Sequence, residues 1–208
     1  MSYPQAPWTL KGFAFQTLHL IDLAKASPFV PPELAIVSVA PGKTLGGVYL
    51  SNYGVGSSLE YSELIVIAGL VKRGQTIGAW VSHIYVDNPD SVSGGREIWG
   101  MPKELATFDW QTGAQRVVVQ QEGQVLCSLS AGGRVSLWRQ SIAFPAYSLL
   151  NSNFVRFNAA ALANFGLITA KLEVPSASPF ARVIDTLPTI AASADALELK
   201  VDAPKVVE

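Results

Sequence analysis

Residues 115–140 read QRVVVQQEGQVLCSLSAGGRVSLWRQ, and this stretch decides the fold class. It holds three short apolar runs, Gln115–Gln121, Gln124–Ser130 and Arg134–Gln140, with glycine-containing turns between them. Apolar runs of this length, separated by very short turns, are typical of strands in antiparallel hairpins. The stretch therefore predicts a three-stranded meander.

The same pattern extends in both directions along the chain. Two segments favour a helix, Asp22–Ser27 and the alanine-rich Ala159–Asn164. Many strands and little helix predict an all-β fold, an antiparallel barrel or sandwich with one or two short helices. The further expected strands are Phe13–Ile21, Ala35–Ala40, Thr44–Tyr53, Tyr61–Lys72, Thr76–Val86, Leu105–Trp110, Leu167–Val174 and Leu197–Val201.

Length and composition set the organisation of the molecule. The 208 residues show no break in composition, so one domain over 1–208 is expected, with a mobile tail at about 202–208. Hydrophobic residues make up 49% and charged residues only 15%. So few charges predict that part of the surface is covered by other copies of the chain in a homo-oligomer.

Several classes of protein are excluded at this stage. A net charge of −1 without a basic run argues against nucleic-acid binding. The longest apolar stretch, Leu64–Val71, is far too short to span a membrane, and the N-terminus has no apolar signal region, so a cytoplasmic protein is expected. The single cysteine, Cys127, excludes an internal disulfide. With only His19 and His83 beside it, no metal site is expected.

The stretch Gly94–Ala106 carries the residues best suited to chemistry. Its three glycines and Pro102 give a strongly shaped backbone, and Lys103 follows directly, close in sequence to Trp99 and Met101. Apolar neighbours remove water from an amine and so favour its uncharged, nucleophilic form. Lys103 is therefore a candidate nucleophile, and the alternative is a surface lysine after a tight turn.

Three motifs together resemble the acetoacetate decarboxylase superfamily. They are Tyr61-Ser62-Glu63, then Val86-Asp87-Asn88, then the pattern GRE-x-x-G-x-PK at residues 95–103. Their order and spacing agree with the superfamily over about residues 61–108. A denser resemblance, from Pro7-Trp8 to Phe108, is to the plant neoxanthin-deficient-type branch, which is linked to a step of xanthophyll formation.

This resemblance implies a cone-like antiparallel β-barrel around a ligand pocket. In the decarboxylases, the lysine of the PK motif attacks the substrate ketone and forms a Schiff base, whose protonated imine withdraws electrons so that CO₂ can leave. Lys103 stands at the matching position, and no cofactor is implied because the lysine itself is the electrophilic catalyst. Glu63 matches one of the family's paired carboxylates. It is expected to act as a general acid and base or as a hydrogen-bond acceptor, and the alternative is an exposed glutamate at a strand start.

The sequence also departs from the decarboxylase pattern. The second lysine of the motif is replaced by Glu104, which at ~5 Å and an effective dielectric of ~20 would favour the ammonium form of its neighbour by about 3 kcal/mol. In an extended chain, however, adjacent residues point to opposite faces. The family's first-strand arginine is absent from Gly12-Phe13-Ala14, and a strand acid is absent from Gly47-Val48-Tyr49. The pocket is therefore expected to be less charged than one built for acetoacetate.

The other candidate residues surround Lys103 in the sequence. Arg96 and Glu97 would either brace the loop as an ion pair or, through Arg96, hold a ligand carboxylate. The remaining ligand-binding candidates are Tyr85, Trp99, Met101 and Glu104.

Two functions stay open from the sequence. One is a lysine Schiff-base lyase acting on a keto acid or related carbonyl compound. The other is a non-decarboxylating binding or accessory protein for an apolar, isoprenoid- or carotenoid-type ligand, favoured by the missing arginine and acid.

Overall fold

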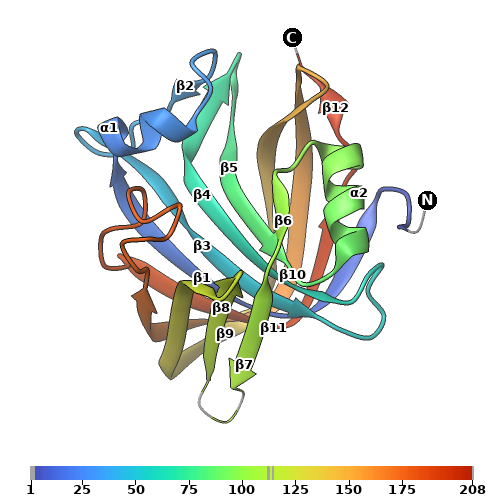
Figure 1. Cartoon of the computed structure of the whole chain (residues 1–208), viewed down its shortest axis with the longest axis vertical. Helices are drawn as coiled ribbons and strands as arrows, with labels where there is room; N and C mark the ends of the chain where they lie inside the picture. The colour runs from blue at the N-terminus through green and yellow to red at the C-terminus, as the bar shows by residue number, and fades with distance from the viewer. Residues whose placement is uncertain (1–2, 112, 114, 208) are drawn as a thin grey trace.

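The computed structural model describes residues 3–111, 113 and 115–207, which form one large sheet with three short helical segments (Figure 1). The helical segments are α1 (Leu23–Ala26), a 3₁₀ turn η1 (Ser27–Phe29) and α2 (Pro89–Trp99). The strands are β1 (Trp8–Asp22), β2 (Ala35–Ile36), β3 (Lys43–Tyr53), β4 (Tyr61–Arg73), β5 (Thr76–Val86), β6 (Lys103–Leu105), β7 (Thr107–Gln111), β8 (Arg116–Gln121), β9 (Gln124–Leu150), β10 (Asn153–Glu173), β11 (Ile190–Val201) and β12 (Lys205–Val206).

The sheet closes on itself, which confirms the all-β expectation. Its strand order is β12-β10-β11-β1-β3-β4-β5-β9-β8-β7, and an additional pairing of β9 with β10 closes the path from β10 to β9 into a ring. A closed sheet has no free edges where it is closed and encloses an interior. Two pairings, β5 with β6 and β5 with β9, are parallel, so the sheet is mixed rather than purely antiparallel.

The central element of this closure is β9, which is 27 residues long. Its first part pairs with β8, its last part pairs with β5, and β10 runs beside nearly all of it. The turn expected at Gly132-Gly133 is therefore wrong, because both glycines lie inside β9. The register with β10 shifts between Ile168 and Ala170, and glycines inside a strand commonly accompany such irregularities.

The helix expected at Ala159–Asn164 is also wrong. This segment belongs to β10 and pairs with β9 on one side and β11 on the other. Alanine favours a helix only weakly, and two flanking ladders of hydrogen bonds outweigh that preference. The small side chains serve the barrel interior, where Ala159 and Ala161 line the cavity.

Helix α2 was missed, because Asn88-Pro89-Asp90 and Gly94-Gly95 both resemble turns. In the structure, the side chain of Asn88 caps the helix by accepting from the backbone N–H groups of Asp90 and Ser91, at 2.8 and 3.2 Å. Proline is well tolerated in the first turn of a helix, where its missing N–H would have no partner. Gly100 ends the helix with a φ of +65°, a left-handed conformation that glycine adopts easily.

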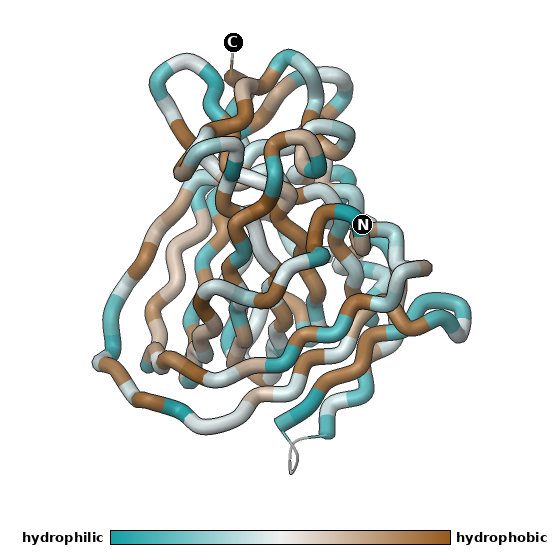
Figure 2. Tube along the Cα trace, turned by 90° about the vertical axis from the view of Figure 1, so that its left-hand side faces the viewer, coloured by the Kyte–Doolittle hydropathy of each residue, from teal (hydrophilic) through white to brown (hydrophobic). Residues whose placement is uncertain are grey.

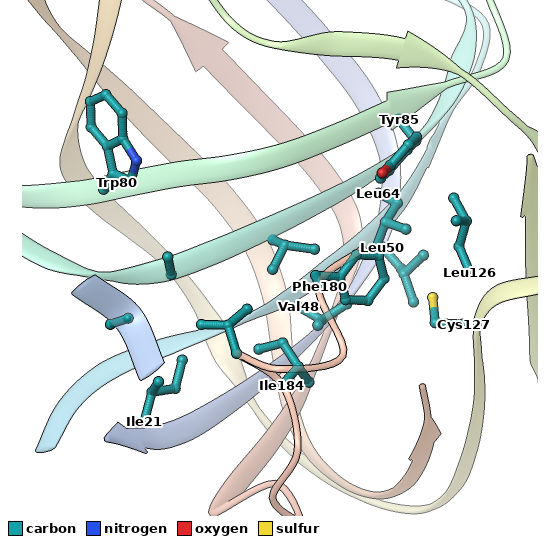
Figure 3. Close-up of a cluster of buried hydrophobic side chains, with 14 of the residues drawn as sticks. Ile21, Val48, Leu50, Leu64, Trp80, Tyr85, Leu126, Cys127, Phe180 and Ile184 are labelled. Carbon is teal, nitrogen blue, oxygen red and sulfur yellow. The ribbon is translucent and has the colours of Figure 1, made fainter. Parts of the chain in front are cut away.

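The sheet buries apolar residues on both faces in its middle strands. Hydrophobic and hydrophilic residues alternate along many strands (Figure 2). The inward face forms the barrel interior. The outward face of β3, β4 and β5 packs under β9 and the segment around Phe180, with Val48, Leu64 and Cys127 in one buried cluster (Figure 3). Strand β4 is therefore packed on one face by this cluster and lines the cavity with the other.

The tail expected to be mobile contains a short strand. Residues Lys205 and Val206 form β12 against β10, and the Val207 backbone N–H donates to the Phe154 carbonyl at 2.9 Å. The helix expected around Asp22 is α1, although the Asp22 side chain bonds Lys43 rather than the helix end. Within residues 3–111, 113 and 115–207, none of the helices has the length and apolar content needed to cross a lipid bilayer.

Candidate functional site

A cavity of about 520 Å³ lies inside the barrel. It follows the inward face of β4 from Glu63 to Leu70, roughly 23 Å at about 3.3 Å per residue. Nearly all of its lining side chains are apolar. Among the residues that the structure describes, Glu63 and Lys103 are the only charged ones on its wall.

The two ends of this cavity differ. At one end, Trp8 and Trp99 are buried against each other, with ring centroids 4.8 Å apart, and close the cavity. At the other end, Ile77, Ile142 and Phe144 line the cavity and are 46%, 44% and 42% exposed. A ligand would therefore enter through an apolar mouth and meet the charged pair at the closed end.

Lys103 is positioned by β6 and α2. Strand β6 pairs in parallel with β5, which sets Lys103 opposite Ile84. The Arg96 Nε donates to the Lys103 carbonyl oxygen at 2.7 Å. A Cβ atom added to Gly95 would lie 2.7 Å from the Lys103 Cε, so only glycine leaves room for the lysine side chain to pass the helix. Helix, loop and strand together thus direct Lys103 into the barrel.

The Lys103 amine is surrounded by hydrogen-bond partners. Its Nζ lies 2.8 Å from Glu63 Oε1, 2.9 Å from Ser91 Oγ and 3.5 Å from the Tyr61 hydroxyl. It also lies 4.8 Å from the centroid of the Tyr61 ring and 5.7 Å from that of Trp8. The Lys103 and Glu63 side chains are only 6% and 5% exposed. A buried pair of this kind is tolerated because its polar atoms find partners.

Two further tyrosines continue the network from Glu63. The Tyr53 hydroxyl donates to Glu63 Oε2 at 3.2 Å, and the Tyr49 and Tyr53 hydroxyls are 3.0 Å apart. Burial raises the pKa of Tyr49 and of Tyr53 well above the usual range of a phenol. The pKa of Tyr61 is raised in the same way, first by burial and then by the nearby Glu63 carboxylate. All three are therefore neutral hydroxyls at ordinary pH.

Four of the expected site residues lie on the cavity wall. Lys103 and Glu63 meet there, although 40 residues separate them in sequence, and Trp99 and Met101 line the wall beside them. Glu104 does not face the same pocket. It is exposed and accepts a hydrogen bond from Gln121 Nε2 at 2.8 Å, as expected from the alternation of side chains along a strand.

Three other candidates lie away from the cavity. Arg96 is exposed and braces the Lys103 carbonyl, while Glu97 accepts a hydrogen bond from the Tyr3 hydroxyl, so the two do not pair with each other among the described residues. Tyr85 packs in the outer cluster beside Phe180, and burial raises its pKa to about 12 (Figure 3). None of the three side chains lines the cavity.

Sequence reasoning missed two residues beside the amine. Ser91 lies in the first turn of α2, and its role could not be predicted while that helix was interpreted as a turn. Tyr61 stood in the motif with Glu63, two residues away, and that spacing alone places both on one face of a strand. The described residues contain no group of three or more His, Cys, Asp or Glu side chains that could hold a metal ion.

The sequence is similar to three curated plant proteins. It is 40% identical to Protein NEOXANTHIN-DEFICIENT 1 of Oryza sativa over 102 residues, which are 49% of this chain and 33% of that protein. The proteins of the same name in Solanum lycopersicum and Arabidopsis thaliana are each 37% identical over 52% and 51% of this chain. The match spans only about a third of each relative's length.

The fold is similar to those of solved structures of low sequence identity. The acetoacetate decarboxylase of Legionella pneumophila superimposes with a TM-score of 0.78 at 15% identity, over 100% of this chain and 90% of that chain. The enduracididine biosynthesis enzyme MppR, solved in complex with pyruvate, gives a TM-score of 0.77 at 12% identity, over 100% and 92%. These likenesses establish the fold.

The family itself follows from the sequence. The pattern of the family described as Acetoacetate decarboxylase (ADC) matches residues 1–161 of the 208. The matched part includes Lys103, Glu63 and all of the residues that surround the amine. The chain therefore belongs to the acetoacetate decarboxylase family.

Proposed function

We propose that the protein forms an imine between Lys103 and the carbonyl carbon of a largely apolar aldehyde or ketone held inside the barrel. The observation that carries this proposal is the Lys103 amine at the closed end of an apolar cavity, 2.8 Å from a single carboxylate, Glu63. Family membership supports the same chemistry, because the PK motif lysine is the residue that reacts in the decarboxylases.

The contact with Glu63 supplies the proton transfers that imine formation needs. The ammonium first gives a proton to the Glu63 carboxylate, and the free amine adds to the carbonyl carbon to form a carbinolamine. The protonated Glu63 then returns its proton to the carbinolamine hydroxyl, which leaves as water. An iminium ion and the original carboxylate remain, so protons and charge balance.

The lining of the cavity argues against a keto acid. A substrate carboxylate is usually held by a free cation, often an arginine. The one cation on the described part of the cavity wall is Lys103, which is already paired with Glu63. A substrate carboxylate would therefore be placed beside another carboxylate. An uncharged carbonyl compound with a long apolar body matches this wall better than acetoacetate does.

A second candidate function is non-covalent binding of an isoprenoid- or carotenoid-type ligand. The apolar wall and exposed apolar mouth favour it, as does the similarity to plant proteins named for a deficiency in neoxanthin. This function would not need the Lys103 amine.

Trapping with borohydride separates the two candidates. The protein is incubated with 2-undecanone or pyruvate in the presence of borohydride, and adducts are mapped by mass spectrometry. We expect an adduct on Lys103 with the apolar ketone. Pyruvate should give less of this adduct or none, and the variant Lys103→Met should give none with either compound. The matched control Lys171→Met removes an exposed lysine and should keep the adduct.

The other outcomes are equally informative. Adducts spread evenly over exposed lysines would contradict the imine proposal. Saturable binding of an apolar ligand that survives in Lys103→Met, without any adduct in the wild-type protein, would support the binding function instead.

A further inference from the structure

We infer that Tyr49 is a catalytic proton donor and acceptor for the carbon next to the imine, and that Tyr53 connects it to Glu63. This inference rests on the proposed imine chemistry and adds a role that the lysine and the glutamate alone do not fill. It is carried by a continuous set of oxygen–oxygen contacts that begins on the cavity wall and ends at the carboxylate.

The registry of β3 and β4 builds this arrangement. Tyr49 and Tyr53 are four residues apart on β3 and so point to the same face of the sheet. Opposite them on β4, Tyr53 faces Tyr61 and Ser51 faces Glu63. The two hydroxyls are 3.0 Å apart, and Tyr53 lies 3.2 Å from Glu63 Oε2. The other oxygen of Glu63 holds Lys103 at 2.8 Å, so one carboxylate serves both the amine and the tyrosines.

Tyr49 combines a place on the cavity wall with the hydrogen bond to Tyr53, which sets it apart from the other two tyrosines. It lines the cavity, while Tyr53 is buried behind it and is absent from the described cavity wall. Tyr61 also lines the cavity but lies against the Lys103 nitrogen, at 3.5 Å. Tyr49, rather than Tyr61, is therefore assigned to the proton that moves at a carbon beyond the imine nitrogen.

The step balances without any added reagent. The iminium ion loses a proton from its α carbon to the Tyr49 oxygen, while the Tyr49 proton passes to Tyr53 and the Tyr53 proton passes to Glu63. The electrons of the broken C–H bond form the C=C bond of an enamine and neutralise the iminium nitrogen. Iminium and carboxylate thus become enamine and carboxylic acid, and the reverse sequence protonates the enamine.

The raised pKa values of both tyrosines are consistent with this role. Because burial disfavours the phenolate, each hydroxyl keeps its proton until it can pass one on in the same step. The tyrosines then relay protons between the cavity and Glu63, and neither of them becomes a stable phenolate.

Deuterium exchange tests this inference separately from imine formation. The protein is incubated with 2-undecanone in D₂O, and deuterium at the α carbons is followed by NMR, while borohydride trapping on Lys103 is measured in parallel. In Tyr49→Phe we expect exchange to fall about 100-fold, with trapping changed by less than about twofold. Tyr53→Phe should show the same split. The control Tyr85→Phe removes a buried hydroxyl outside the cavity and should leave both readouts unchanged.

A second measurement reports on the number of moving protons. The exchange rate as a function of the deuterium content of the solvent should curve in the wild-type protein and approach a straight line in Tyr53→Phe. Equal loss of trapping and exchange in Tyr49→Phe would overturn the inference, because Tyr49 would then only shape the cavity. Full exchange in Tyr49→Phe, or loss only in Tyr61→Phe, would overturn it as well. Absence of trapping in the wild-type protein would instead refute the imine proposal on which it rests.

Discussion

Lys103 and Glu63 form an ion pair that is almost completely withdrawn from water. Removal of one partner leaves an uncompensated charge in the interior, whereas removal of both leaves an apolar wall. We expect Lys103→Met to lower the free energy of unfolding by about 3–5 kcal/mol. The double variant Lys103→Met/Glu63→Leu should cost far less than the sum of the two single changes. Urea denaturation followed by circular dichroism measures all of these values.

Additive losses would show that the two side chains do not depend on each other in the folded protein. The exposed pair Lys171 and Glu173 provides the comparison, because solvent screens the attraction between exposed charges and the two single changes should therefore add.

At the scale of residues, the sequence could predict the reacting groups but not their full surroundings. Lys103 and Glu63 stood in motifs of the family, and the outward direction of Glu104 followed from strand alternation. Ser91 could not be found, because it reaches the amine only through the capped helix α2. The contact between Tyr53 and Glu63 depends on the registry of two strands, which a single sequence does not contain.

At the scale of elements, helix α2 contains Gly94 and Gly95 because other side chains pack directly against its backbone there. A Cβ on Gly95 would meet the side chain of Lys103, and one on Gly94 would meet the ring of Trp8. We expect Gly95→Ala to lower borohydride trapping on Lys103 at least tenfold, because the added methyl displaces the lysine. Helix content should be unchanged or higher, since alanine favours a helix by about 1 kcal/mol over glycine.

Ser93→Ala is the matched control on the same helix, because it removes only a hydroxyl that bonds the Pro89 carbonyl. Mass spectrometry and circular dichroism supply the two readouts. Unchanged trapping in Gly95→Ala would contradict the assigned position of Lys103 against the helix.

The strands were predictable at this scale wherever apolar residues alternated or ran continuously. The errors came from residues whose local preference differs from their role in the assembled sheet. Gly132 and Gly133 lie inside β9, which β10 pairs on one side at this point. The alanines of Ala159–Asn164 lie inside β10, which pairs with β9 on one side and β11 on the other. The secondary structure of these glycine and alanine segments can be predicted correctly only when the neighbouring strands are known.

The whole molecule should lose stability in mild acid. Burial lowers the pKa of both His19 and His83, so the folded protein binds fewer protons than the unfolded chain between the folded pKa values and about 6.5. The contribution of the two histidines to the free energy of unfolding should therefore be fully present near pH 7.5 and fall as the pH drops below about 6.5. Each histidine contributes at most about 1.4 kcal/mol per pH unit.

Urea titrations at intervals between pH 7.5 and pH 5 test this dependence. The variant His19→Gln/His83→Gln should show a flatter profile than the wild-type protein over that range. A free energy of unfolding that rises as the pH falls from 7.5 to 5 would contradict this prediction.

The long strand β9 leaves an edge open on the outside of the molecule, and we propose that a second copy of the chain pairs there. Among the described strands, the part of β9 between its pairings with β8 and β5 has β10 on one side only. Val135 and Trp138 on this stretch are both 67% exposed. Its two arginines are already paired within the chain, to Asp195 and Glu198, so two such edges can meet without repulsion.

Light scattering measures the outcome of this proposal. The wild-type protein should be a dimer or larger, and Trp138→Lys should shift it towards the monomer. The control Val55→Lys changes another exposed hydrophobic residue, which is 89% exposed in a loop, and should leave the assembly intact. A monomeric wild-type protein, or an assembly insensitive to Trp138→Lys, would contradict the proposal.

The cavity closes at Lys103 and opens between Ile77 and Phe144, so the affinity for a ligand should depend on the length of its apolar chain. Each methylene group added to a ligand chain strengthens binding by about 0.8 kcal/mol, close to fourfold in affinity, while it remains inside the barrel. Once the chain reaches the mouth, further carbons stay in solvent and add little. A plot of log affinity against chain length would therefore rise and then level off, and the position of the break would act as a ruler for the distance from the amine to the rim.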